Sequence, residues 1–223
     1  MSAKLFFSAI IKFLLGVVLV FALVFLPAGT LKYAQGWLFM GLLFVPMFVA
    51  GVFMMIKNPQ LLKKRLNGKE KLKEQNLVIK LSGLMFITGF VIAGLNFRFE
   101  LFMLPLWASL IASALFLFAY VLYALVMKQN PYLSRTVEVQ QDQRVIDTGV
   151  YSVVRHPMYS ATLLLFIMIP LVLGSVFALP VFLLYPFIIA KRLLSEEEFL
   201  KKELAGYSEY MKKVRYRLIP FVW

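Results

Sequence analysis

Apolar and polar residues occur along this chain in blocks, with six apolar runs separated by shorter polar segments. The runs cover residues 5–26, 36–56, 77–95, 102–127, 158–173 and 176–189. A helix needs about 20 apolar residues to cross the hydrocarbon core of a bilayer, so the first four runs predict membrane-spanning helices. The last two are short for full spans, and we expect a helical hairpin or a crossing where the bilayer is thinned.

This pattern predicts an all-α polytopic membrane bundle with about five to six membrane segments, in one domain of residues 1–223. Residues 1–56 would form an N-terminal helical hairpin that anchors the chain, and residues 57–223 would form the core. The composition agrees, because 61% of the residues are hydrophobic, whereas soluble domains are about 45–50% apolar. The chain has no cysteine and one histidine, which excludes disulfides and disfavours a metal site.

Basic residues give a net charge of +13 and lie in loops beside the apolar runs. With six crossings, all of the 24 Lys and Arg residues except Lys32 and Arg98 fall on one side. The positive-inside rule places that side, with both termini, in the cytoplasm; in a prokaryote this means the inner membrane. Lys and Arg beside apolar runs indicate contact with lipid headgroups, so nucleic-acid binding is not favoured. No feature of the sequence indicates an oligomeric state.

Residues 57–76 are basic and begin with a helix-start signal. Asn58 can cap a helix whose first residue is Pro59. Leu61, Leu62 and Leu66 then predict a short amphipathic helix that lies on the headgroups.

Residues 137–159 form the longest polar segment between apolar runs and contain the only histidine. Residues 136–140 alternate and could form a short strand. A second charged cluster covers residues 191–198, one hairpin later, so the two segments should meet on one face as a small-molecule site. At Arg155-His156-Pro157 we expect free backbone N–H groups of a helix start to favour an anion. His156 could contact a ligand, or it could fix the loop through a carbonyl.

Arg192 and Glu196 are four residues apart and share a helix face. They could form an ion pair, or Arg192 could bind a substrate carboxylate. Glu196, Glu197 and Glu198 cannot all face one site, because successive residues are about 100° apart around a helix. The chain contains neither G-x-G-x-x-G nor a Walker pattern, so a nucleotide-like cofactor would need another kind of site.

These two segments carry a family resemblance. Residues 149–159 read G-V-Y-S-V-V-R-H-P-M-Y, and residues 192–197 read R-L-L-S-E-E. Together they resemble the R-H-P-x-Y…E-E signature of isoprenylcysteine carboxyl methyltransferases, whose wider group includes phospholipid N-methyltransferases. Residues 58–66 and 206–220 are also similar to bacterial members. Ala161 stands where a glycine is common.

The resemblance implies a membrane methyltransferase that uses S-adenosylmethionine in a cytosolic pocket and takes a lipophilic acceptor from the bilayer. The implied catalytic residues are Arg192, facing the acceptor carboxylate, and Glu197, a possible base for an amine acceptor. The implied cofactor contacts are Gln140, Gln143, Arg144, Val145, Ile146, Tyr151, His156, Pro157, Met158, Tyr159 and Glu196.

Several alternatives stay open. The acceptor could be an amine lipid such as phosphatidylethanolamine, or the protein could be a non-enzymatic membrane scaffold. Tyr151 and Tyr159 could be interfacial anchors instead of cofactor contacts. Residues 216–223 could anchor the chain in the interface or form a flap over the cofactor.

Overall fold

The computed structural model describes residues 3–66, 73–134 and 137–223, and the regular secondary structure of these residues is helical. The elements are α1 (Ala3–Ala28), α2 (Ala34–Lys57), α3 (Pro59–Leu66), α4 (Lys73–Arg98), α5 (Leu106–Gln129), η1 (Gly149–Ser152), α6 (Pro157–Val172), α7 (Leu179–Phe182), α8 (Tyr185–Glu203) and α9 (Tyr207–Lys213). The predicted all-α membrane bundle is confirmed. The short strand suggested for residues 136–140 does not form over residues 137–140, and Thr136 lies outside the described residues.

Four helices, α1, α2, α4 and α5, are long and apolar enough to cross a membrane. They correspond to the first four predicted spans. Only 11% of the most apolar window of α1 and of α2 is buried inside the protein, so most of their side chains are left to face lipid. The fourth spanning helix, α5, begins at Leu106 and not at residue 102, because Pro105 in extended conformation precedes it.

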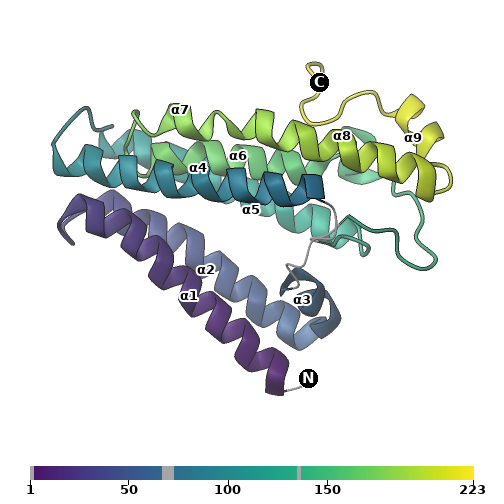
Figure 1. The fold of residues 1–223 in the computed structure, drawn as a ribbon, viewed down its shortest axis with the longest axis horizontal. Helices are drawn as coiled ribbons and strands as arrows, with labels where there is room; N and C mark the ends of the chain where they lie inside the picture. Colours follow the sequence, from purple (N-terminus) through teal and green to yellow (C-terminus); the bar gives the residue numbers. More distant parts are fainter. Residues whose placement is uncertain (1–2, 67–72, 135–136) are drawn as a thin grey trace.

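The last two apolar runs form the predicted hairpin, but its second arm is interrupted. α6 runs out from the polar end of the bundle, and α7 and α8 return (Figure 1). Pro180 and Pro186 lie in the first turns of α7 and α8, where a missing N–H is tolerated. Gly174 makes the turn after α6 with a φ of 71°. α8 continues beyond the apolar run and therefore carries the charged residues 191–198 on one continuous helix.

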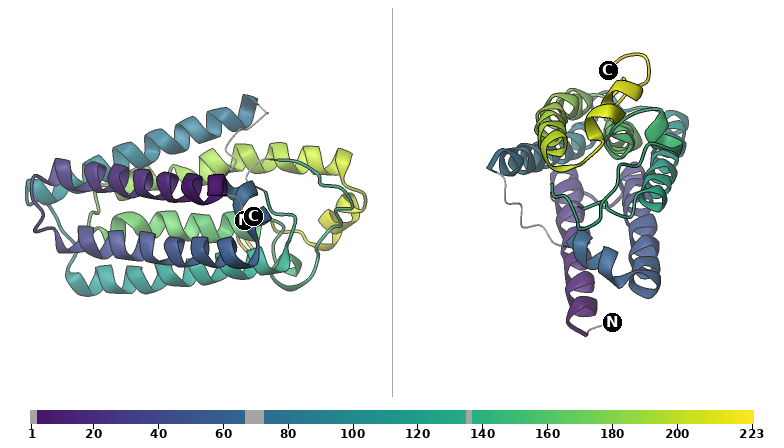
Figure 2. Two further views of the ribbon diagram at one scale, coloured as in Figure 1. Left: turned by 90° about the horizontal axis from the view of Figure 1, so that it is seen from below. Right: turned by 90° about the vertical axis from the view of Figure 1, so that its right-hand side faces the viewer.

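The α1–α2 hairpin forms a layer beside α4 to α8 and is inclined to it, so that the two layers are close at one end and splay apart toward the start of α1 (Figures 1 and 2). Between the layers, the fully buried Phe39 of α2 packs against Phe90 of α4 and Phe116 of α5. Phe182 of α7 is also fully buried and packs against Phe90 within the second layer. Helices α1 and α4 come close at Gly94, where an added Cβ would lie 2.6 Å from the carbonyl oxygen of Val24. The absence of a side chain is therefore what permits this packing.

The start of α1, α3, α9 and the C-terminus lie at the same end of the bundle (Figure 1). These are the polar segments that the charge pattern predicted to share one side of the membrane. The predicted start of α3 is confirmed, because the side-chain oxygen of Asn58 accepts a hydrogen bond from Leu61 N at 3.0 Å. Lys12 Nζ donates to Leu66 O at 2.8 Å and ties the end of α3 to α1.

Candidate functional site

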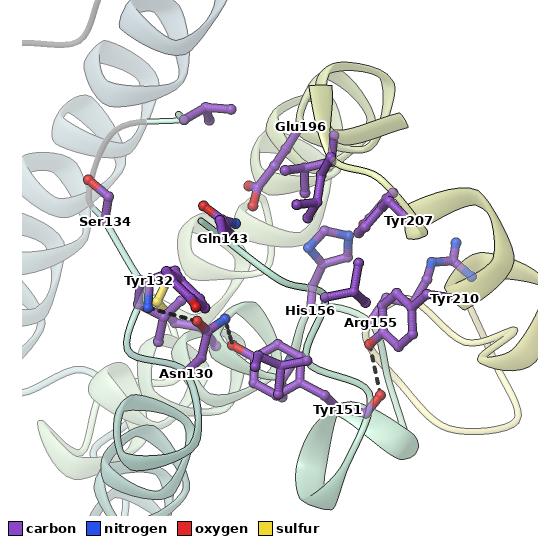
Figure 3. Close-up of a pocket in the computed structure, with 18 of the residues that line it drawn as sticks. Asn130, Tyr132, Ser134, Gln143, Tyr151, Arg155, His156, Glu196, Tyr207 and Tyr210 are labelled. Carbon is purple, nitrogen blue, oxygen red and sulfur yellow. Dashed lines mark hydrogen bonds between the residues drawn. The ribbon is translucent and has the colours of Figure 1, made fainter. Parts of the chain in front are cut away.

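A pocket opens at this polar end, between the loop after α5 and the helices α6, α8 and α9 (Figure 3). Its empty space, counted out to the open mouth, is about 840 Å³. Its walls come from residues 130, 132–134, 137–138 and 143–146 of the loop, and from η1, the first turn of α6, the second half of α8, and α9. The two segments singled out in the sequence therefore do meet at one pocket.

Tyr159 connects the charged groups on the α8 wall. Its hydroxyl donates to Glu196 Oε2 at 2.5 Å and accepts from Arg192 Nε at 3.0 Å. All three residues line the pocket. The four-residue spacing on α8 thus places a cation and a carboxylate on one face, and the tyrosine from α6 holds both side chains.

Glu197 lies behind the pocket wall in a buried cluster of charges. Its side chain is 3% exposed, and its carboxylate accepts hydrogen bonds from Arg155 Nε at 2.6 Å and Arg217 Nε at 3.0 Å. His156 Nε2 lies 3.2 Å from the same carboxylate. Burial alone would raise the pKa of Glu197, but the hydrogen bonds from His156, Arg155 and Arg217 outweigh it and lower the pKa to about 2. Glu197 is therefore ionised at neutral pH.

The three successive glutamates take three different environments, as the helical period requires. Glu196 lines the pocket, Glu197 is buried in the cluster, and Glu198 is exposed. On one turn of α8, the three carboxylates therefore face the pocket, the protein interior and the solvent.

The C-terminal tail binds the backbone of the R-H-P segment. Arg155 N donates to Tyr216 O and His156 N donates to Arg217 O, each at 2.9 Å. Arg155 Nη1 also donates to Val214 O at 2.7 Å. The expectation of free N–H groups at Arg155 and His156 is therefore wrong, because carbonyl groups from the tail already accept from them. Among the described residues, none after Tyr210 lines the pocket.

Tyrosines form much of the opposite wall. Asn130 Nδ2 donates to Tyr151 Oη at 2.9 Å, and Tyr210 Oη donates to Tyr151 O at 2.8 Å (Figure 3). Burial raises the pKa of Tyr151 to about 12 and that of Tyr207 further above its ordinary value. The hydroxyl of Tyr207 is buried without a hydrogen-bond partner among the described residues. Because such a group is costly to leave unpaired, it marks a position where a ligand atom would be accommodated.

The structure places most of the candidate residues at the pocket. Those that line it are Gln143, Arg144, Val145, Ile146, Tyr151, His156, Pro157, Met158, Tyr159, Arg192 and Glu196. Gln140 and Glu197 do not line it. Gln140 instead supports the loop, since its backbone N–H donates to Gln143 Oε1 at 2.9 Å and its amide nitrogen donates to Tyr132 O at 2.6 Å.

Several wall residues are not among those predicted individually as catalytic residues or cofactor contacts. They are Asn130, Tyr132, Leu133, Ser134, Val137, Glu138, Arg155, Leu200, Leu204, Tyr207 and Tyr210. For Tyr207 and Tyr210 the sequence does contain a signal, because two residues three apart after a glycine can share one face of a short helix. In the structure they do lie on such a helix, which follows Gly206 with a φ of 81°. The loop residues had no such signal, because their positions depend on contacts with α6, η1 and one another.

Comparison with known families covers the part of the chain that builds this pocket. Residues 107–206 match the family model of phospholipid methyltransferase. The matched segment runs from the start of α5 to Gly206 and includes Arg192, Glu196 and the R-H-P-x-Y segment. It supports a membrane methyltransferase, and it leaves α1 to α4 and the tail outside the match. A comparison with curated proteins found no match.

Proposed function

We propose that this protein transfers a methyl group from S-adenosylmethionine to the carboxylate of a lipophilic acceptor, of the isoprenylcysteine type or a related lipid. The observation that carries the proposal is the Arg192–Tyr159–Glu196 arrangement in a pocket built largely from the segment that matches phospholipid methyltransferases. We further propose that the pocket end faces the cytoplasm, because nearly all Lys and Arg residues belong to that end.

The residues of the pocket fit this cofactor. Glu196 offers a carboxylate that can accept from ribose hydroxyls or lie near a sulfonium. The hydroxyl of Tyr207, which has no hydrogen-bond partner among the described residues, could donate to a ligand heteroatom. The rings of Tyr151 and Tyr210 can stack on adenine or contact a cation through their faces.

S-adenosylmethionine, when bound, supplies a methyl group on a positively charged sulfur. Transfer to a carboxylate breaks the S–CH₃ bond and forms an O–CH₃ bond, leaving a neutral thioether and a neutral ester with no proton released. The chain therefore needs groups that bind and orient, not a base. Arg192 would orient the acceptor carboxylate, while Tyr159, which is itself bonded to Glu196, holds the Arg192 guanidinium. Positioning of this kind can lower a barrier by several kcal/mol.

A second candidate is transfer to the amine of a phospholipid, which the description of the matched family favours. An amine acceptor loses a proton, so it requires a base. Glu197 is poorly placed for that role, because three basic side chains hold its carboxylate outside the pocket lining. Glu196 would have to serve instead, since it lines the pocket.

The experiment is calorimetric titration of S-adenosylhomocysteine into detergent-purified protein, followed by methyl transfer from labelled cofactor to a panel of lipids. Glu196→Gln should weaken binding roughly tenfold, the usual cost of one charge-assisted hydrogen bond. Glu198→Gln is the matched control, because it removes the same charge two residues away on an exposed face. Absence of cofactor binding to the unaltered protein would refute both candidates, and the labelled lipid decides between carboxylate and amine.

A further inference from the structure

Arg65, at the end of α3, brings a cation to the edge of the pocket from outside the matched segment. Its Nη1 and Nη2 atoms lie 3.9 Å and 3.8 Å from Met158 Sδ. Its Cζ lies 5.6 Å from the ring centroid of Tyr123 on α5. Since Met158 lines the pocket, the guanidinium of Arg65 is separated from the pocket by one side chain.

These contacts leave the donors of Arg65 poorly satisfied. A guanidinium has five N–H donors, and a thioether sulfur is a weak acceptor. Among the described residues, the buried Nε atom has no hydrogen-bond partner and no carboxylate lies within ion-pair distance of Arg65. The aromatic ring attracts the cation through its face but does not replace an oxygen acceptor for the N–H groups. An N–H donor that is buried without an acceptor is costly, so the Nε atom of Arg65 is a position where an anionic ligand would be favourable.

The charge of Arg65 also acts on Tyr151, a residue of the pocket wall. The pKa of Tyr151 is raised to about 12, chiefly by burial, and the nearby charges of Glu196 and Arg65 act on it in opposite directions. Met158 has an unbranched, flexible side chain that can change rotamer readily. Movement of this one side chain would expose the guanidinium to a ligand in the pocket.

We infer that Arg65 binds the anionic group, a carboxylate or a phosphate, of the lipid acceptor at the membrane-facing mouth of the pocket. The inference rests on the proposed function and adds a residue that would select the acceptor. The acceptor is favoured over the cofactor as the source of the anion because α3 is an amphipathic helix next to the spanning helix α2, at the level where lipid headgroups lie. Arginine suits the task, because its planar fork binds carboxylate and phosphate in a bidentate manner.

The test compares Arg65→Gln with Lys63→Gln in the full-length protein in detergent. Lys63 is exposed on the same helix, so its substitution removes the same charge without touching the pocket. For each variant, calorimetry gives the affinity for S-adenosylhomocysteine. With that ligand saturating, the shift of the unfolding midpoint gives the affinity for a prenyl thioether carboxylic acid, its uncharged amide, and a phospholipid. Arg65→Lys keeps the charge, so it shows whether an effect of Arg65→Gln comes from the lost charge or from a failure to fold.

We expect Arg65→Gln to weaken binding of one anionic lipid by roughly tenfold or more, with the affinity for S-adenosylhomocysteine within about twofold of the unaltered protein. Lys63→Gln should behave as the unaltered protein, Arg65→Lys should retain part of the affinity, and the amide should bind all variants equally. The acid and the phospholipid distinguish carboxylate from phosphate. The inference would be overturned if Arg65→Gln lost as much affinity for S-adenosylhomocysteine as for the lipid, or if its lipid affinity were unchanged. It would also be overturned if the unaltered protein bound neither anionic lipid. Because these are binding measurements, a lack of methyl transfer would count against the proposed function and leave this test intact.

Discussion

The substitution Glu197→Gln tests whether the buried charge cluster stabilises the protein through its ionised carboxylate. Glutamine keeps the size of the side chain and removes the charge that Arg155, His156 and Arg217 contact. The pKa of Glu197 falls from an ordinary 4.5 to about 2 on folding. At about 1.4 kcal/mol for each pKa unit, ionisation in the folded state contributes about 3 kcal/mol to the free energy of unfolding. We expect Glu197→Gln to lose about that amount at pH 7.

The sign of the pH dependence follows from the lowered pKa. The stabilisation is complete above pH 4.5, where the carboxylate is ionised in both folded and unfolded states. It decreases as the pH falls from about 4.5 toward 2, because in this range the unfolded state binds a proton and the folded state does not. The difference in unfolding free energy between the unaltered protein and Glu197→Gln should therefore shrink between pH 4.5 and pH 2.

The assay is denaturant unfolding in an acid-stable detergent at several pH values. Glu198→Gln serves as the control, because Glu198 is exposed on the same turn of α8, and its loss should change the free energy of unfolding by less than about 0.5 kcal/mol. A cost for Glu197→Gln that stays the same from pH 7 to pH 2 would refute the reasoning, since it would show that the charge is not what stabilises the cluster.

Two further predictions concern ligand binding and helix packing. Tyr207→Phe removes a buried hydroxyl that has no hydrogen-bond partner among the described residues. It should weaken S-adenosylhomocysteine binding by roughly threefold to tenfold without lowering the unfolding midpoint. Unchanged affinity by calorimetry would show that the ligand does not use this hydroxyl. Gly94→Ala would place a Cβ 2.6 Å from Val24 O and should cost about 1–3 kcal/mol in unfolding experiments. Gly83→Ala on the same helix has no atom within 4 Å of the new Cβ and should be neutral or stabilising; equal effects of the two substitutions would contradict the packing argument.

The cluster around Glu197 also explains why the R-H-P segment needs its arginine. Arg155 joins Glu197 on α8 to the carbonyl oxygens of Val214 and Arg215 in the tail. The pocket residues Pro157 to Tyr159 follow directly in the chain. These contacts of Arg155 fix the start of α6 relative to α8 and the tail.

Local properties of the sequence determined the helices and their ends. The apolar runs are long enough for four spanning helices, and Asn58 has the side chain that caps α3. The helical period also required Glu196, Glu197 and Glu198 to face different surroundings. Each of these features depends on residues within a few turns of one another, so the sequence alone predicts them.

Tertiary structure decided how the charged groups are used. Glu196 faces the pocket and Glu197 the interior because Arg155, His156 and Arg217, distant in the sequence, converge on only one of them. Carbonyl groups of the tail accept from the Arg155 and His156 N–H groups. Arg65 reaches Met158 across 93 positions of chain. A periodic pattern gives the face on which a side chain lies, but only the packing of distant segments gives its partners.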